Sequence, residues 1–83
     1  MTKPDIERFV IAYRRSDEHI HEELPLRIGL VELQVLFSRP NDDPMYDAYP
    51  VTEAQRASLE KILGKHLDLS RYDYFVESWK VPS

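Results

Sequence analysis

A two-residue alternation of side chains near each end of the chain limits most strongly the folds that this sequence can adopt. In residues 6–15, Phe9, Ile11 and Tyr13 would face one way, and residues 72–81 alternate around aromatic and β-branched side chains. The other face of the first stretch would carry Arg8, Val10, Ala12 and Arg14. Successive side chains of a strand point to opposite faces of a sheet, so both stretches are predicted to be strands.

A polar turn at residues 16–18 leads to a second predicted strand, residues 19–24. Alternation places Ile20 and Leu24 on one face of this strand. Its other face would carry His19, His21 and Glu23. Pro25 has no N–H to donate to a neighbouring strand, so the pairing should end there. The first 25 residues therefore predict a β-hairpin.

Residues 30–37 have a helical period, because Leu30, Leu33 and Phe37 would align on one face. This helix is expected to be buried on more than one side, since other apolar residues surround that face: Val31, Val35 and Leu36. It should end before Pro40, which pushes the preceding residue out of the helical region.

A second helix is predicted at residues 53–63. Thr52 and Gln55 match a capping box, and Gly64 suits the left-handed residue that follows a helix. Its inner side would carry Leu59, Ile62 and Leu63.

The predicted fold is α+β, in the order β-β-α-α-β, with two helices on one face of a small antiparallel three-stranded sheet. In the last strand, Tyr74 and Val76 would oppose Phe75 and Trp79, and this aromatic density is typical of packing against helices.

The chain has 83 residues, 42% hydrophobic and 31% charged, which suits one domain over residues 1–83 with a modest core. It has no cysteine, which excludes disulfides and thiolate metal sites and suits a reducing compartment. The N-terminal region lacks the continuous apolar segment of a signal peptide or a membrane span. We therefore expect a cytoplasmic protein without a membrane partner.

Negative charge is concentrated in one connection. Residues 40–54 contain no Lys or Arg, and their charge equals the chain's net charge of −4. The acidic residues are Asp42, Asp43, Asp47 and Glu53. Such a field repels nucleic-acid phosphates and attracts a basic surface. We name residues 42–52 the acidic loop; its simplest interpretation is a solvated loop that uses Asp, Asn and Pro for its turns.

Few residue patterns in the chain favour chemistry. His19 and His21 on one strand face could bind zinc with His66 or Glu23, but the third ligand is unassigned. The loop aspartates lack the central glycine and terminal glutamate of a calcium-binding EF-hand loop. With two glycines the chain has no phosphate-binding glycine loop, and no serine has a nucleophile-elbow context. We predict no cofactor, no metal and no enzymatic activity.

Nucleic-acid binding is also disfavoured. The arginines are dispersed along the chain rather than gathered in a stripe. The one exception is the pair Arg14 and Arg15 beside Tyr13, which suits contact with RNA. No nucleic-acid partner is therefore expected.

Two interpretations of the acidic loop remain. In the first, Tyr46 and Tyr49 among Asp42, Asp43 and Asp47 form a recognition surface, because tyrosine combines apolar area with a hydroxyl group. In the second, the tyrosines fold back over the helices and pin the connection. Glu18, Glu22 and Glu23 offer a rival acidic surface on the hairpin.

Several motifs together resemble a small bacterial domain family that is associated with polymorphic toxin systems. They are Asp43-Pro44-Met45-Tyr46-Asp47, Tyr49-Pro50-Val51-Thr52, Gln55 and Tyr72-Asp73-Tyr74-Phe75. The resemblance extends from about residue 5 to residue 79. It implies an immunity protein, which binds a cognate toxin and blocks its active site or substrate groove.

The partner implied by this resemblance is a toxin protein, and a basic nuclease-like domain would suit the acidic charge. Asp42, Asp43 and Asp47 would steer association and Tyr46 and Tyr49 would anchor it, with Glu53 beside them. A regulatory or adaptor domain is the alternative. A homodimer that pairs an exposed strand edge, and an enzyme of unknown chemistry, are further alternatives.

Overall fold

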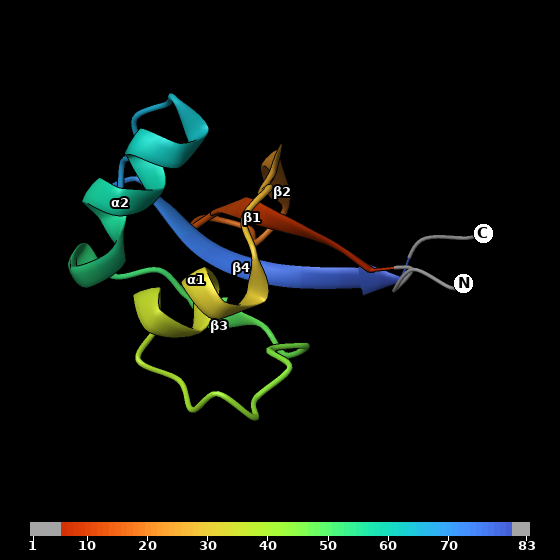
Figure 1. Ribbon diagram of the computed structural model, residues 1–83. Coiled ribbons are helices and arrows are strands. Elements are labelled where there is room, and N and C mark those ends of the chain that lie inside the picture. The colour runs from red at the N-terminus through yellow and green to blue at the C-terminus, as the bar shows by residue number, and fades with distance from the viewer. Residues whose placement is uncertain (1–5, 81–83) are drawn as a thin grey trace.

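The computed structural model describes residues 6–80. Strand β1 (Ile6–Arg14) lies between β2 (Ile20–Pro25) and β4 (Tyr72–Lys80) and pairs antiparallel with both. The hairpin and the final strand are thus confirmed, while Val81, the predicted end of that strand, lies outside the described residues. The α+β class is also confirmed (Figure 1).

The prediction of three strands in the order β-β-α-α-β is wrong. A short strand, β3 (Tyr49–Pro50), pairs antiparallel with β4 and gives a four-stranded sheet in the order β2-β1-β4-β3. The element order becomes β-β-α-β-α-β. Two residues are too few to show an alternation, and proline is disfavoured within strands. The strand exists because the acidic loop is held along the edge of β4.

The predicted faces of β2 need correction. The register shifts between Ala12 and Tyr13, so that Ala12 pairs with Glu22 but Tyr13 pairs with Ile20. This β-bulge turns Ile20 toward the face opposite that of Leu24, and Ile20 is 46% exposed. The strand begins at Ile20, so His19 precedes it and the predicted shared face of His19 and His21 is absent.

The two helices are α1 (Leu30–Leu36) and α2 (Glu53–Leu63). At the start of α2, Thr52 accepts a hydrogen bond from the N–H of Ala54, and the Gln55 side chain accepts one from the Thr52 N–H. Gly64 ends this helix in the left-handed conformation, with φ 67°. The predicted capping box and terminal glycine are confirmed.

Helix α1 is buried on one side rather than on several. Leu33 is fully buried, but Val31 and Val35 are 70% and 75% exposed. In α2, Leu59 is fully buried as predicted, whereas Ile62, which was predicted to lie on the inner side, is 44% exposed. Residues 6–80 form a single sheet, so each helix has one surface to cover and its other apolar residues remain at the surface.

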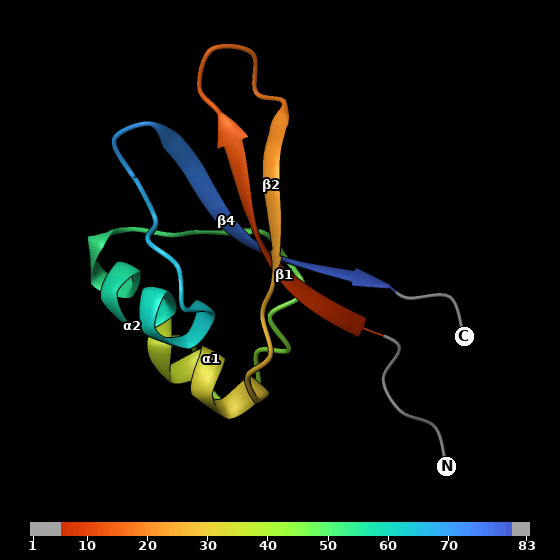
Figure 2. The ribbon, with the colours of Figure 1, turned by 90° about the horizontal axis from the view of Figure 1, so that it is seen from above.

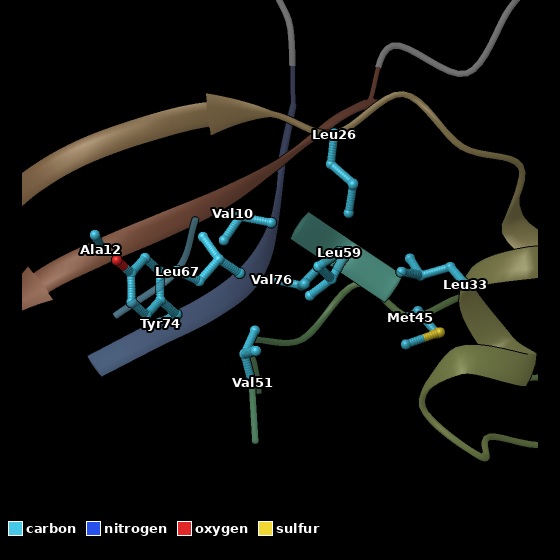
Figure 3. Close-up of a cluster of buried hydrophobic side chains, with 10 residues drawn as sticks. All are labelled: Val10, Ala12, Leu26, Leu33, Met45, Val51, Leu59, Leu67, Tyr74 and Val76. Atoms are coloured by element: carbon cyan, nitrogen blue, oxygen red, sulfur yellow. The ribbon is translucent and has the colours of Figure 1, made fainter. Parts of the chain in front are cut away.

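The core lies between the helices and one face of the sheet (Figure 3). It joins sheet residues to Leu33 of α1 and Leu59 of α2. The sheet contributes Val10, Ala12, Tyr74 and Val76. Figure 2 shows both helices on the same side of the sheet, as predicted. Neither helix within residues 6–80 is long and apolar enough to cross a membrane.

Candidate protein-binding surface

Asp43 holds the acidic loop in one conformation. Its carboxylate accepts hydrogen bonds from the N–H of Met45 at 2.8 Å and from the hydroxyl of Tyr49 at 3.2 Å. It also forms an ion pair with Arg39 at 2.6 Å, and the guanidinium of Arg39 lies 5.7 Å from the centre of the Tyr49 ring. The contacts of Asp43 and Tyr49 therefore agree with the second interpretation, in which the tyrosines hold the connection in place.

Met45 anchors the loop in the core. Its side chain is fully buried, although its φ of 55° is unfavourable for a residue with a side chain. The Met45 carbonyl accepts a hydrogen bond from Ser78 of β4, and Arg8 of β1 donates one to the carbonyl of Pro44 at 2.8 Å. Gln34 of α1 donates one to the carbonyl of Asp43 at 2.7 Å. The sheet and α1 thus fix the loop from both sides.

Replacing Asp43 with asparagine should make the protein less stable at neutral pH and less sensitive to acid. The Met45 N–H and then the Arg39 guanidinium lower the pKa of Asp43 from its usual value. A lowered pKa in the folded state stabilises the fold above the unfolded pKa of about 4, and this contribution is lost as the pH falls through the folded value. The stability gap between wild type and Asp43→Asn should therefore narrow as the pH falls from about 5 to about 2.

Urea unfolding at a series of pH values measures this gap. The control is Asp42→Asn, which makes the same change of charge at an exposed residue. Asp17, Glu60 and Asp68 also have lowered pKa values, so the wild type loses stability in acid for several reasons and only the difference between variants is diagnostic. A gap that stays constant with pH would show that the ionised Asp43 does not hold the loop.

The loop also presents side chains to solvent. Asp42 and Asp47 are exposed and Tyr46 is 56% exposed. Within the described residues, none of the three makes a side-chain hydrogen bond or ion pair. Glu53 lies at the start of α2 and pairs with Arg56 at 2.8 Å. Of the residues predicted to bind a partner, Asp43, Tyr49 and Glu53 are thus engaged within the chain. Asp42, Tyr46 and Asp47 have no side-chain partner among residues 6–80.

A second surface lies on the face of the sheet that the helices leave uncovered. We name it the open sheet face. It consists of Phe9, Ile11 and Tyr13 of β1 with Phe75, Glu77 and Trp79 of β4. Ile11 is fully buried beneath its neighbours, while Trp79 is 38% exposed. The aromatic residues Phe75 and Trp79 therefore face away from the helices, contrary to the prediction that this aromatic density packs against them.

Glu77 lies at the centre of a hydrogen-bond network on the open sheet face. Its carboxylate accepts hydrogen bonds from the Tyr13 hydroxyl and, at 3.3 Å, from the indole Nε1 of Trp79. Burial and the nearby Glu77 raise the pKa of Tyr13 to about 12, so its hydroxyl stays protonated at neutral pH. The rings of Tyr13 and Phe75 contact edge to face with centroids 5.8 Å apart, and those of Phe9 and Trp79 lie 5.3 Å apart.

Two hollows are lined in part by residues of the open sheet face. One, of about 390 Å³, is lined by two aromatic residues, Ala48 and three carboxylates. The aromatic residues and carboxylates are Tyr13, Phe75, Glu18, Asp73 and Glu77. The other, of about 320 Å³, is lined by Tyr46 of the acidic loop and by Trp79. The rest of its lining is Ile6, Ser78 and Lys80, which the strand register places on the helix-covered face. Tyr46 and Trp79 thus line one hollow at the end of the sheet.

The histidines are separated in the structure. His19 lies near Asp17, with 3.6 Å between His19 Nδ1 and a carboxylate oxygen, while His21 stacks on Tyr72 with ring centroids 4.4 Å apart. His66 Nδ1 lies 2.7 Å from Glu60. Among residues 6–80, no group of three or more acidic or histidine side chains is arranged to hold a metal ion.

The sequence of the two long strands already indicates that one face of the sheet would stay uncovered. Both β1 and β4 carry apolar residues on both of their faces, as in the runs Phe9–Tyr13 and Tyr74–Val76. A strand that is apolar on both faces usually needs cover on both. The two helices can cover only one face, so the other is left with aromatic residues at the surface.

The chain was compared with known proteins. A family model described as "Domain of unknown function (DUF7683)" matches residues 7–77. This segment extends from β1 into β4 and includes the whole acidic loop. The comparisons with curated proteins and with solved structures gave no match. Because the matched segment covers most of the 83 residues, the chain belongs to the DUF7683 family of domains of unknown function.

Proposed function

We propose that this protein is a binding domain for a basic protein partner, and specifically an immunity protein that neutralises a cognate bacterial toxin in the cytoplasm. The observation that carries the proposal is the exposed acidic and aromatic surface formed by Asp42, Tyr46 and Asp47. The motif resemblance to a family associated with polymorphic toxins supplies the toxin as the class of partner. No catalytic group is needed for this function.

The proposed mechanism is occlusion of the toxin's active site or substrate groove. A toxin that acts on nucleic acid has a basic groove, and carboxylates at the surface of an inhibitor steer it toward such a groove. Tyr46 would supply apolar contact area beside the charges. Asp43 and Met45 hold the loop before binding, so little conformational entropy would be lost when the partner docks.

Isolation of the tagged protein from its source bacterium, with mass spectrometry of the co-purifying chains, tests the first step. The expected result is one stoichiometric partner with a basic toxin domain. That domain, produced alone in a heterologous bacterium, should stop growth, and co-production of this protein should restore it. Growth arrest that this protein does not relieve would contradict the immunity function. Stoichiometric recovery with a housekeeping enzyme would instead support a regulatory or adaptor domain.

A further inference from the structure

We infer that the open sheet face is a docking site for a partner protein that inserts an arginine side chain into the hollow beside Tyr13 and Glu77. The inference rests on the proposed function in one respect, which is the basic character of the partner. It adds the surface that is used and the side chain that is recognised. The site differs from the acidic loop, which the sequence alone had singled out.

The charge of the hollow favours a cation. In the described part of the chain, its lining includes Glu18, Asp73 and Glu77 and no basic residue. Asp73 has a solvent-exposed ion pair with Arg15 at 3.2 Å, while Glu18 has no ion-pair partner within the described residues. Glu23 of β2 pairs with Ile11 in the sheet register, which places a further exposed carboxylate on the same face. These charges are complementary to a basic side chain.

The geometry of the hollow favours arginine among the cations. A guanidinium is planar, donates to carboxylates through a fork of N–H groups and stacks on aromatic rings. Tyr13 and Phe75 supply rings in the lining, and Glu77 supplies a carboxylate held by Tyr13 and Trp79. A carboxylate has about four acceptor positions, so Glu77 has room for an incoming N–H group after these two bonds.

Charge also argues against a second copy of this chain as the occupant. Two such faces in contact would bring the carboxylates of Glu18, Glu23 and Glu77 of each copy together. Like charges placed across an interface are strongly unfavourable. The partly exposed Trp79 and its aromatic neighbours suit a partner surface that is apolar around the basic side chain.

Nuclear magnetic resonance of the isotope-labelled protein tests the docking site directly. The probe is a short acetylated and amidated peptide of alternating arginine and leucine. A second peptide has citrulline in place of arginine, which keeps the shape but removes the charge. We expect the arginine peptide to shift the Trp79 indole resonance and the amide resonances of Tyr13, Phe75 and Glu77, and to bind at least about tenfold more tightly than the citrulline peptide.

Substitutions then identify the groups involved. Glu77→Gln should weaken binding of the arginine peptide at least about fivefold, because it removes the charge and keeps the size of the side chain. Glu18→Gln, in the exposed turn, should weaken peptide binding less than Glu77→Gln does. This second variant tests the site even if the Glu77 variant fails to fold. The matched control is Glu32→Gln on α1, where the same change should leave the affinity unaltered.

Three results would overturn the inference. They are equal binding of the two peptides, shifts confined to the acidic loop, and a wild-type dimer in light scattering whose formation broadens the resonances of the open sheet face. The test of this docking site can fail or succeed independently of the test of the proposed function. A toxin that is neutralised equally by wild type and Glu77→Gln would keep the function and reject this site. Peptide binding without a toxin partner would reject the function and keep the site.

Discussion

Met45→Ala is expected to lower the free energy of unfolding by about 2–5 kcal/mol, as for other large-to-small changes in a core. Met45 belongs to a connection, yet its side chain is fully buried in the core with Leu33 and Leu59. Truncation leaves a cavity between the loop, the helices and the sheet. A small domain has a total stability of only about 5–15 kcal/mol, so this loss would unfold a measurable fraction of the protein on mild heating. Urea unfolding monitored by Trp79 fluorescence measures the change in the free energy of unfolding.

Two further variants serve as controls for the Met45→Ala measurement. Met45→Leu nearly conserves volume and should cost less than about 1.5 kcal/mol. Val35→Ala shortens an apolar side chain that is 75% exposed and should change stability by no more than about 0.5 kcal/mol. If Met45→Ala were as mild as Val35→Ala, the loop would not be part of the core, and the rigid presentation of Tyr46 and Asp47 would lose its basis.

Reversing the free charges of the acidic loop is expected to slow association with a basic partner by about tenfold or more at low ionic strength. The variant is Asp42→Lys with Asp47→Lys. It leaves Asp43 unchanged, because that residue holds the loop through Met45 and Arg39. The effect should shrink as salt rises above about 0.15 M, where charges are screened over about 8 Å. Stopped-flow or surface-binding kinetics with the partner identified by affinity isolation measures the association rate.

The control for this experiment is Glu32→Lys on α1, which changes the net charge by the same amount as Asp47→Lys alone. Steering by the loop predicts a larger decrease in association rate for Asp47→Lys than for Glu32→Lys. Equal decreases would show that only the net charge of the protein matters. An unchanged rate in the double variant would remove the loop from the interface and leave the open sheet face as the surface to test.

Local sequence patterns predicted most of the elements because each pattern acts through neighbouring residues. The capping box of Thr52 and Gln55 defined the start of α2, and Gly64 defined its end. The two-residue period identified β1, β2 and β4, and the polar turn at residues 16–18 identified the hairpin. The concentration of acidic residues in the loop was equally visible, since it needs no knowledge of contacts.

Contacts that the sequence patterns do not show decided the rest. Asp43 was one of several similar aspartates in sequence, and only the approach of Arg39, Met45 and Tyr49 made it a structural residue while Asp42 and Asp47 stayed free. Strand β3 exists because Val51 and its neighbours reach the edge of β4, where the Val51 N–H bonds to the Tyr74 carbonyl. The partners of Asp43 are near it in sequence, but an Asp-to-N–H turn of this kind could also form at the other aspartates. The pairing of β3 with β4 joins distant residues and has no local signal.

The sequence by itself determined the α+β class, the hairpin, both helices and the place of the acidic loop, because propensity, period and capping are local properties. Only the tertiary structure decided which face of the sheet the helices cover. Both faces of β1 and β4 are apolar, so alternation could not choose between Val10 with Val76 and Phe9 with Trp79. Packing of Leu33 and Leu59 against Val10 and Val76 made that choice, and it left the aromatic residues around Glu77 on the uncovered face.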